Sequence, residues 1–201
     1  MDSTRRMLLT LLGIVVYCGS PASWSAERKE WIKLTNCRYV EQPYNDGDSF
    51  HMQCGEHEFV ARLYFVDTPE ANLRYPDRTR EQSEYFGVSL DEALRAGRQA
   101  TSATREALRQ PFVLWTREAS AGGRTRVPRY YSFVEVGGQD LAELLVRQGL
   151  ARTKGVMANG PTGIPARTKQ DTLFALERAA QQQKRGVWGT STPTPVAQRA
   201  Q

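Results

Sequence analysis

The chain has 201 residues, a length that suits one domain with short attachments, and hydrophobic residues make up 40% of it. That fraction supports a packed core and excludes a membrane protein built from apolar spans. The formal charge of +5 favours polyanionic partners such as nucleic acid or an anionic membrane, although a genome that writes Arg in place of Lys gives a similar composition without any such partner.

The N-terminal segment 1–26 has the order of a secretory signal peptide. Two arginines precede an apolar run over 7–17, and small residues follow it. The run is too short for an ordinary transmembrane helix. We therefore expect cleavage between Ala22 and Ala26 and a secreted or periplasmic protein with no other membrane association, the alternative being an uncleaved anchor.

Export would leave two cysteines, Cys37 and Cys54, in an oxidising compartment. The two lie about equally far from the turn at Asn45-Asp46, and such positions face each other in an antiparallel hairpin. We therefore predict a cross-strand disulfide, with two buried free thiols as the alternative.

The first part of the domain has the pattern of β-strands followed by a loop. Asp46-Gly47 predicts a tight hairpin turn, and Thr68-Pro69 ends the last strand. The residues from 71 to 88 are polar, basic and aromatic without a clear period, and are predicted to form a loop that either guides a polyanion or is simply solvated. The predicted strands cover 31–40, 50–54 and 59–66.

The second part mixes helices and strands. A capping box at 89–92 opens a helix that ends near Arg109, and Val187-Trp188 should dock on the core. The tail 189–201 is rich in Thr, Pro and Gln and is predicted to be disordered. The other predicted elements are strands over 112–116 and 130–136, a helix over 141–148 that Asp140 caps and Gly149 ends, a loop over 157–165 and a helix over 168–184. This order predicts an α+β fold with a small closed or partly closed barrel flanked by helices.

Two short acidic runs carry the chemistry. One is Asp46-Gly47-Asp48-Ser49, and the other follows Arg62 at the end of an apolar strand, as Asp67-Thr68-Pro69-Glu70. Carboxylates suit a hard cation, and the guanidinium fork of arginine matches phosphate oxygens. The two histidines, His51 and His57, are predicted to lie on the surface, and with no Cys-Xaa-Xaa-Cys pair they do not indicate zinc. The combination favours phosphodiester chemistry.

These runs resemble the staphylococcal nuclease (thermonuclease) family without a gap. The same resemblance extends to 145–151 and to the run ending Lys184-Arg185-Gly186-Val187-Trp188, so that it covers about 31–188. It implies an OB-fold, a five-stranded β-barrel flanked by three helices. It also implies a calcium-dependent endonuclease that acts on DNA and RNA with little sugar specificity.

The resemblance also implies a role for each matching residue. Asp48 and Asp67 would be ligands of one calcium ion, with Thr68 adding its carbonyl oxygen. Arg62 would bind the scissile phosphate, and Glu70 would act as general base on the attacking water.

The resemblance leaves two candidates for the second catalytic arginine of the family. Counting back from Gln148-Gly149-Leu150 without a gap places it at Arg129, and the altered segment before that strand leaves Arg126 as a rival that would at least bind substrate. The family's nucleotide-packing tyrosines are not evident, since 151–155 stands in their place.

Two other functions remain compatible with the sequence. One is a catalytically weak or inactive OB-fold module that binds nucleic acid or protein, and the other is an envelope protein that interacts through its tail. For the enzyme, we expect DNA and RNA as substrates, no stable protein partner and a monomer.

Overall fold

The structure, a computed structural model, describes residues 30–122 and 127–190. The predicted signal segment, Arg126 and residues 191–201 of the predicted tail lie outside the described residues.

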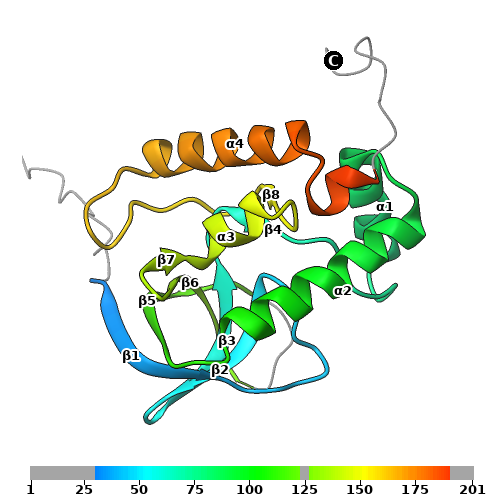
Figure 1. Cartoon of the computed structure of the whole chain (residues 1–201). Coiled ribbons are helices and arrows are strands. Elements are labelled where there is room, and N and C mark those ends of the chain that lie inside the picture. Colours follow the sequence, from blue (N-terminus) through cyan, green and yellow to red (C-terminus); the bar gives the residue numbers. More distant parts are fainter. Residues whose placement is uncertain (1–29, 123–126, 191–201) are drawn as a thin grey trace, which may run out of the picture.

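Five strands form a closed barrel in the order β3-β2-β1-β5-β6 (Figure 1). Neighbouring strands run antiparallel, and a parallel pairing of β3 with β6 closes the barrel. The barrel strands are β1 Ile32–Tyr39, β2 Ser49–Cys54, β3 His57–Leu63, β5 Phe112–Ser120 and β6 Arg129–Val136. Outside the barrel, β7 Gln139–Asp140 pairs with β6, and β4 Val66–Asp67 pairs with β8 Arg152–Thr153. The predicted α+β fold with a five-stranded barrel is confirmed.

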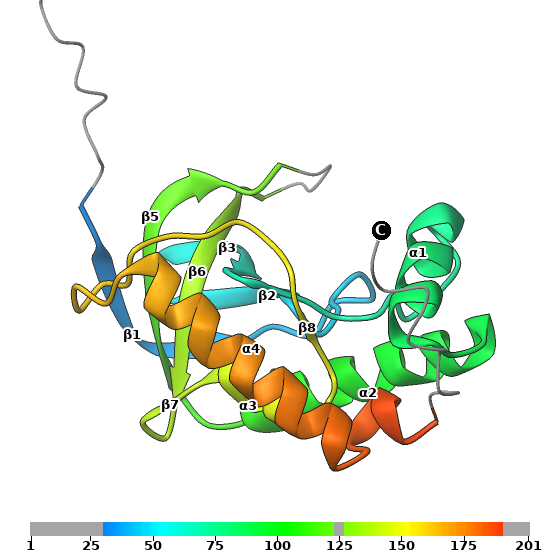
Figure 2. The ribbon, with the colours of Figure 1, turned by 90° about the horizontal axis from the view of Figure 1, so that it is seen from above.

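The described residues form four α-helices and one short 3₁₀-helix outside the barrel. In Figure 2, α4 lies over α3, and α1 stands beside α2 at the end of the molecule away from β1. Their bounds are α1 Pro76–Phe86, α2 Leu90–Ala107, α3 Leu141–Arg147, α4 Ala166–Gln182 and η1 Gly186–Gly189. None of the described helices is both long enough and apolar enough to cross a membrane.

The predicted helix signals are confirmed where they are local. Ser89 and Glu92 form the reciprocal capping box of α2, and Asp140 caps α3 by accepting from the backbone of Glu143. Val187 and Trp188 are buried in η1, as predicted.

Two hydrophobic clusters hold these elements together. The larger fills the barrel with residues such as Phe50, Met52 and Leu114 and continues under α3 and α4. The smaller one joins α1, α2, α4 and η1. Its members are Phe86, Ala96, Ala180, Val187 and Trp188. The second cluster anchors α1, a helix that the sequence pattern did not predict.

The prediction of a loop over 71–88 was wrong, because residues 76–86 form α1. Pro76 occupies the first turn, where its missing N–H costs nothing, and Gly87 ends the helix in the left-handed conformation. The helix is polar over most of its length, so its sequence lacks the apolar residues at helical spacing from which a helix is usually predicted. It is a fourth helix where three were expected.

The predicted strand over 59–66 and the predicted hairpin turn are also corrected. Phe65 has a φ of 69°, which ends β3 and redirects the chain into β4. Asp46-Gly47 is part of the longer connection between β1 and β2. A Cβ on Gly47 would lie 2.8 Å from side-chain atoms of both Thr68 and Ala100, so this glycine permits close packing rather than a tight turn.

His51 is buried, contrary to the prediction. Its ring nitrogens contact the Tyr44 hydroxyl and the Glu58 carboxylate, each at 2.8 Å. His57 is exposed, as predicted.

The structure contains the predicted disulfide between Cys37 and Cys54, whose Cα atoms are 4.2 Å apart. The neighbouring pairs Arg38–Gln53 and Tyr39–Met52 place the two cysteines opposite each other on β1 and β2. Both sulfurs belong to the buried core.

Replacing both cysteines with serine is expected to lower the free energy of unfolding by about 3 kcal/mol, since the bond spans 17 residues of an otherwise unconstrained denatured chain. Denaturant unfolding measures this loss. A reductant should lower the unfolding midpoint of the wild type and leave that of the double variant unchanged. An unshifted wild-type midpoint in reductant would show that the bond contributes nothing to stability.

Candidate active site

Arg62 lies between the two carboxylates that the sequence singled out. Its Nη1 donates to Oδ1 of Asp48, and its Nη2 donates to Oδ1 of Asp67 at 3.3 Å. Both carboxylates are almost fully buried, and the Arg62 side chain is only 12% exposed. One guanidinium therefore joins the two acidic runs.

The barrel brings these runs together through its strand register. Ser49 pairs with Arg62 across β2 and β3, so Asp48, one residue earlier, lies beside the end of β3. The backbone N–H of Leu63 donates to the carbonyl of Asp48 at 2.8 Å. Oδ2 of Asp48 accepts from the backbone N–H of Thr68 at 2.9 Å, which links residues 20 positions apart.

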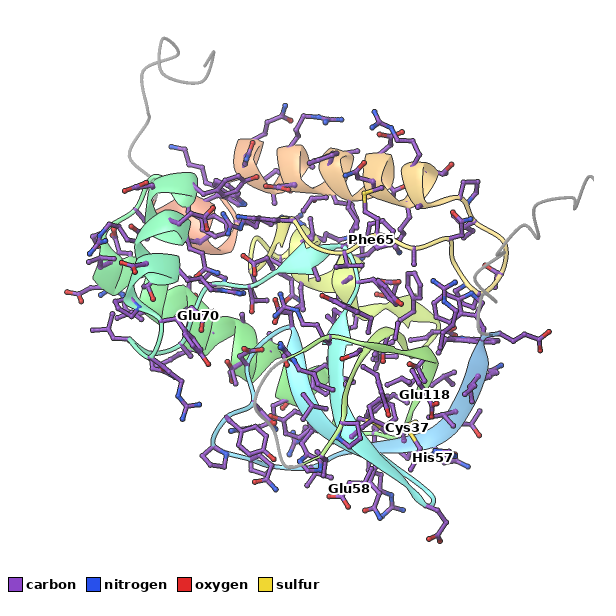
Figure 3. The ribbon with its side chains drawn as sticks, turned by 180° about the vertical axis from the view of Figure 1, so that it is seen from behind. Cys37, His57, Glu58, Phe65, Glu70 and Glu118 are labelled. Carbon is purple, nitrogen blue, oxygen red and sulfur yellow. A yellow bond between two sulfur atoms is a disulfide. The ribbon has the colours of Figure 1, made fainter. Side chains whose placement is uncertain are left out.

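The segment that follows Asp67 passes directly beneath α2. A Cβ on Gly97 would collide with the backbone carbonyl of Glu70, so α2 can approach this segment only because position 97 is glycine. Thr68 and Glu70 are both buried there. In Figure 3, Glu70 lies beside α1 and α2, whereas Cys37 and His57 lie toward the other side of the view, on the barrel strands.

Gln82 of α1 holds the same segment from the other side. Its Nε2 donates to Oδ2 of Asp67 at 3.1 Å and to the carbonyl of Thr68 at 2.8 Å. Its Oε1 accepts from the backbone N–H of Glu70 at 2.8 Å. Because Gln82 is fully buried, one amide group orients three of the predicted site residues.

Arg78 of α1 covers the acidic residues. Its Nε forms an ion pair with Oε1 of Glu70 at 2.6 Å, and its Nη2 donates to Oδ1 of Asp67. The Arg78 side chain is 41% exposed, so this contact faces solvent.

Arg152 of β8 supports Asp67 from inside the protein. Its Nε donates to Oδ2 of Asp67 at 2.8 Å, and its two terminal nitrogens donate to the carboxylate of Glu81 at 2.8 and 2.5 Å. The guanidinium also lies over the ring of Tyr85, 4.8 Å from its centroid. Arg152 is 1% exposed, so Asp67 has a buried cationic partner that does not depend on solvent.

The carboxylates differ in their proton affinity. Burial raises the pKa of Glu70 and the nearby Asp48 and Asp67 raise it further, although Arg78 opposes them. Burial would also raise the pKa of Asp67, but Arg78, Arg152 and Gln82 hold it below its ordinary value. Asp67 is thus kept ionised, while Glu70 is the better proton acceptor.

Two further residues extend the charged site. Burial and the Asp48 carboxylate raise the pKa of Asp46 well above its ordinary value. Nε of Arg129 donates to Oγ of Ser49 at 3.0 Å, and burial together with the nearby charge of Arg62 lowers the pKa of Arg129. The structure therefore places Arg129 beside the acidic runs.

A comparison with protein families supplies the observation that decides the family. The family model described as staphylococcal nuclease homologue matches residues 61–190, more than half of the chain. The chain belongs to the staphylococcal nuclease family. The matched range holds Arg62, Asp67, Glu70 and Arg129, and it begins after Asp48. A search of curated proteins gave no match.

The staphylococcal nuclease family is generally one of nucleases and typically uses calcium. The site contains the types of ligand atom that a hard cation prefers, namely the carboxylate oxygens of Asp48 and Asp67 and the carbonyl oxygen of Thr68. Protein donors already contact them, however: Asp67 accepts from three arginines and Gln82, and the Thr68 carbonyl accepts from Gln82. Across 30–122 and 127–190, no group of three or more His, Cys, Asp or Glu side chains is arranged to hold a metal ion. The residues fit calcium in their chemistry, with arginines and an amide now holding the same oxygens.

Sequence reasoning missed the contributions of α1 and β8 to this site. The buried residues of α1 recur at helical spacing, since Thr79, Gln82, Ser83 and Phe86 stand at i, i+3, i+4 and i+7, and all but Phe86 are polar. That polar period was the available signal, together with Pro76 before it and Gly87 after it. Arg152 had no local signal, because its partner Asp67 lies 85 positions away.

A separate groove of about 510 Å³ lies away from this site. Residues of β5, β6, α3 and α4 line it, including Trp115, Phe133 and Lys169. Lys169 is already paired with Asp140 and Glu143 at 2.9 and 2.6 Å, so its charge is neutralised within the protein. None of the predicted site residues within the described ranges lines this groove.

Proposed function

We propose that this protein is a secreted or periplasmic, calcium-dependent endonuclease that hydrolyses phosphodiester bonds of DNA and RNA. The observation that carries the proposal is the placement of Arg62 between Asp48 and Asp67, with Glu70 next to them. If Arg62 served only to stabilise the fold, one carboxylate partner would be enough. A third carboxylate of raised pKa, Glu70, would then have no role beside it. Membership of a family that is generally one of nucleases supports the same conclusion.

Arg62 and Arg129 would bind the scissile phosphate. In-line attack places negative charge on the equatorial phosphate oxygens, and guanidinium groups are matched to those oxygens in geometry and charge. Arg62 is held in place by two buried carboxylates, and Arg129 by Ser49 on the adjacent strand. Both donors are therefore oriented before substrate binds.

Glu70 would accept the proton of the attacking water. As the water oxygen bonds to phosphorus, its proton passes to Oε of Glu70, and the leaving oxygen departs and takes a proton from solvent. The raised pKa of Glu70 makes it a stronger base than an ordinary carboxylate. For this role the contact of Arg78 with Oε1 has to be released.

Asp48, Asp67 and the Thr68 carbonyl would hold the calcium ion. When bound, the ion supplies positive charge next to the phosphate and polarises its oxygen. The export of the enzyme is supported by the signal-like segment and by the disulfide, since such bonds persist in oxidising compartments. Sequencing the N-terminus of the protein recovered from periplasm or medium tests cleavage within 22–26.

The decisive experiment is cleavage of plasmid DNA and of RNA by the purified protein, with calcium or with chelator. We expect cleavage of both substrates with calcium and none with chelator. Glu70→Gln keeps the size of the side chain and removes its basicity, so it should abolish most of the cleavage. Cleavage that is insensitive to both chelator and Glu70→Gln would contradict the proposal.

A non-catalytic OB-fold module is the second candidate. The observation that favours it is the full set of protein donors on Asp67 and on the Thr68 carbonyl. Such a module would bind single-stranded nucleic acid without turnover in the same assay. Binding measured by fluorescence anisotropy, together with no product after prolonged incubation with calcium, would decide for it.

A further inference from the structure

Four residues of α1 contact the site or the groups that support it. Glu81, Gln82 and Tyr85 make contacts that fix the helix, to Arg152, to the segment 67–70 and to Glu177 respectively. Gln82 is fully buried, and the Tyr85 hydroxyl donates to Glu177 at 2.6 Å. Arg78 differs in its partners, because its side chain pairs with the site carboxylates Asp67 and Glu70 near the start of the helix. Since that side chain is 41% exposed, it can swing into solvent while the other three contacts keep the helix docked.

Arg78 contacts the oxygens that the proposed mechanism needs free. Its Nε lies 2.6 Å from Oε1 of Glu70, and its Nη2 contacts Oδ1 of Asp67. The other Asp67 oxygen, Oδ2, is held by Arg152 and Gln82 from the protein interior. Oδ1, which also accepts from Arg62 at 3.3 Å, is therefore the Asp67 oxygen that can be offered to a cation, and Arg78 covers it from the solvent side.

We propose that Arg78 is a built-in competitor of the divalent cation, which must displace its guanidinium from Asp67 and Glu70 before it can bind. This inference rests on the proposed function, because it concerns access to the same site. Arg78 then sets the cation concentration at which the enzyme becomes active. Below that concentration the guanidinium also blocks Glu70, so the site is held inactive.

The local charge supports competition rather than joint binding. Asp48, Asp67 and Glu70 carry three negative charges and Arg62 one positive charge, which leaves an excess of two negative charges; Arg152 is set aside because it is shared with Glu81. A divalent cation alone would balance that excess, whereas a cation and Arg78 together would exceed it. Two positive groups at the same carboxylate oxygens repel each other strongly in a site this buried. The exposed group, Arg78, is the one free to leave.

The test is calcium binding to the full chain, measured by isothermal titration calorimetry. Arg78→Ala should bind calcium roughly 10- to 100-fold more tightly than the wild type, because the cation no longer has to break the charge-assisted hydrogen bond to Asp67 and the ion pair with Glu70. Arg78→Gln removes the charge but keeps most of the length, and should bind more tightly as well. Arg80→Ala is the matched control and should leave the affinity unchanged, since Arg80 is on the same helix, 62% exposed, and pairs with Asp77.

Each outcome separates this inference from the proposed function. If the wild type cleaves DNA and neither Arg78 variant binds calcium more tightly, the competition is refuted and the nuclease proposal stands. If both variants bind more tightly and no form cleaves, the competition stands and the nuclease proposal fails. If none of the forms binds calcium, both are refuted. A thermal melt without calcium confirms that each variant is folded before titration.

Discussion

Replacing Arg62 with alanine is expected to reduce the rate of phosphodiester cleavage by about 10²–10³-fold, the usual loss when one oriented donor to a developing oxyanion is removed. Arg62 is the residue that both acidic runs hold, through Asp48 and Asp67. Burial opposes its charge, but these carboxylates and Asp46 hold its pKa above the ordinary value, so it is a cation at every relevant pH. Arg62→Lys should recover only part of the lost rate, because a lysine keeps the charge and lacks the planar fork.

The measurement is the initial rate of plasmid nicking at saturating calcium. Arg62→Ala also leaves Asp48 without its buried partner, so denaturant unfolding must show that the variant is folded at the assay temperature. Arg109→Ala provides a control. Arg109 lies just beyond the C-terminal end of α2, is 69% exposed and pairs with Glu106. A folded Arg62→Ala enzyme that cleaves within threefold of the wild-type rate would refute the assigned role.

Replacing Arg152 with methionine is expected to lower the free energy of unfolding by about 3–5 kcal/mol, the usual cost of removing one partner of a buried ion pair. The side chain is 1% exposed and contacts both Asp67 and Glu81. Without it, the buried carboxylate of Asp67 loses its interior cation. Lys154→Met is the matched control, because Lys154 pairs with the same Glu81 carboxylate but is 57% exposed, and its loss should cost about 1 kcal/mol or less.

The pH dependence of stability gives a second test of Arg152. Its hydrogen bonds to Glu81, with a smaller contribution from Lys154, lower the pKa of Glu81 to about 2, from an ordinary value of 4.5. A lowered carboxylate pKa adds stability that is complete above the ordinary pKa and is lost as the pH falls through the folded one. The wild type should therefore lose this contribution between about pH 4.5 and pH 2, and Arg152→Met should lose much less of it. Chemical unfolding across that range measures both slopes; equal slopes would show that Arg152 does not control Glu81.

The elements that were predicted correctly are those whose signals are local. The capping box at Ser89–Glu92 satisfies helix donors within four residues, and the stop at Gly149 follows the periodic residues of α3 directly. The strand with Arg62 near its end was identified by its apolar run. The disulfide followed from counting residues on each side of a turn, and that count held even though the connection is longer than a tight turn.

The elements that were missed depend on contacts distant in sequence. The buried face of α1 is polar apart from Phe86, and the usual search for helices looks for an apolar stripe. Its burial is explained only once Gln82 meets the segment 67–70, and the pairing of Glu81 with Arg152 adds a further contact at the edge of the helix. Phe65 carries a positive φ that no property of phenylalanine predicts, since the surrounding strands impose it.

The sequence by itself determined the family of this protein. The acidic runs and Arg62 are short motifs whose residue types already indicate a hard cation and a phosphate, and they led to the staphylococcal nuclease family that the family comparison shows. Only the tertiary structure decided how these groups are held and what covers them. Arg78, Gln82 and Arg152 come from α1 and β8, and a carboxylate attracts whichever cations the fold brings within a few ångströms, wherever they lie in the chain.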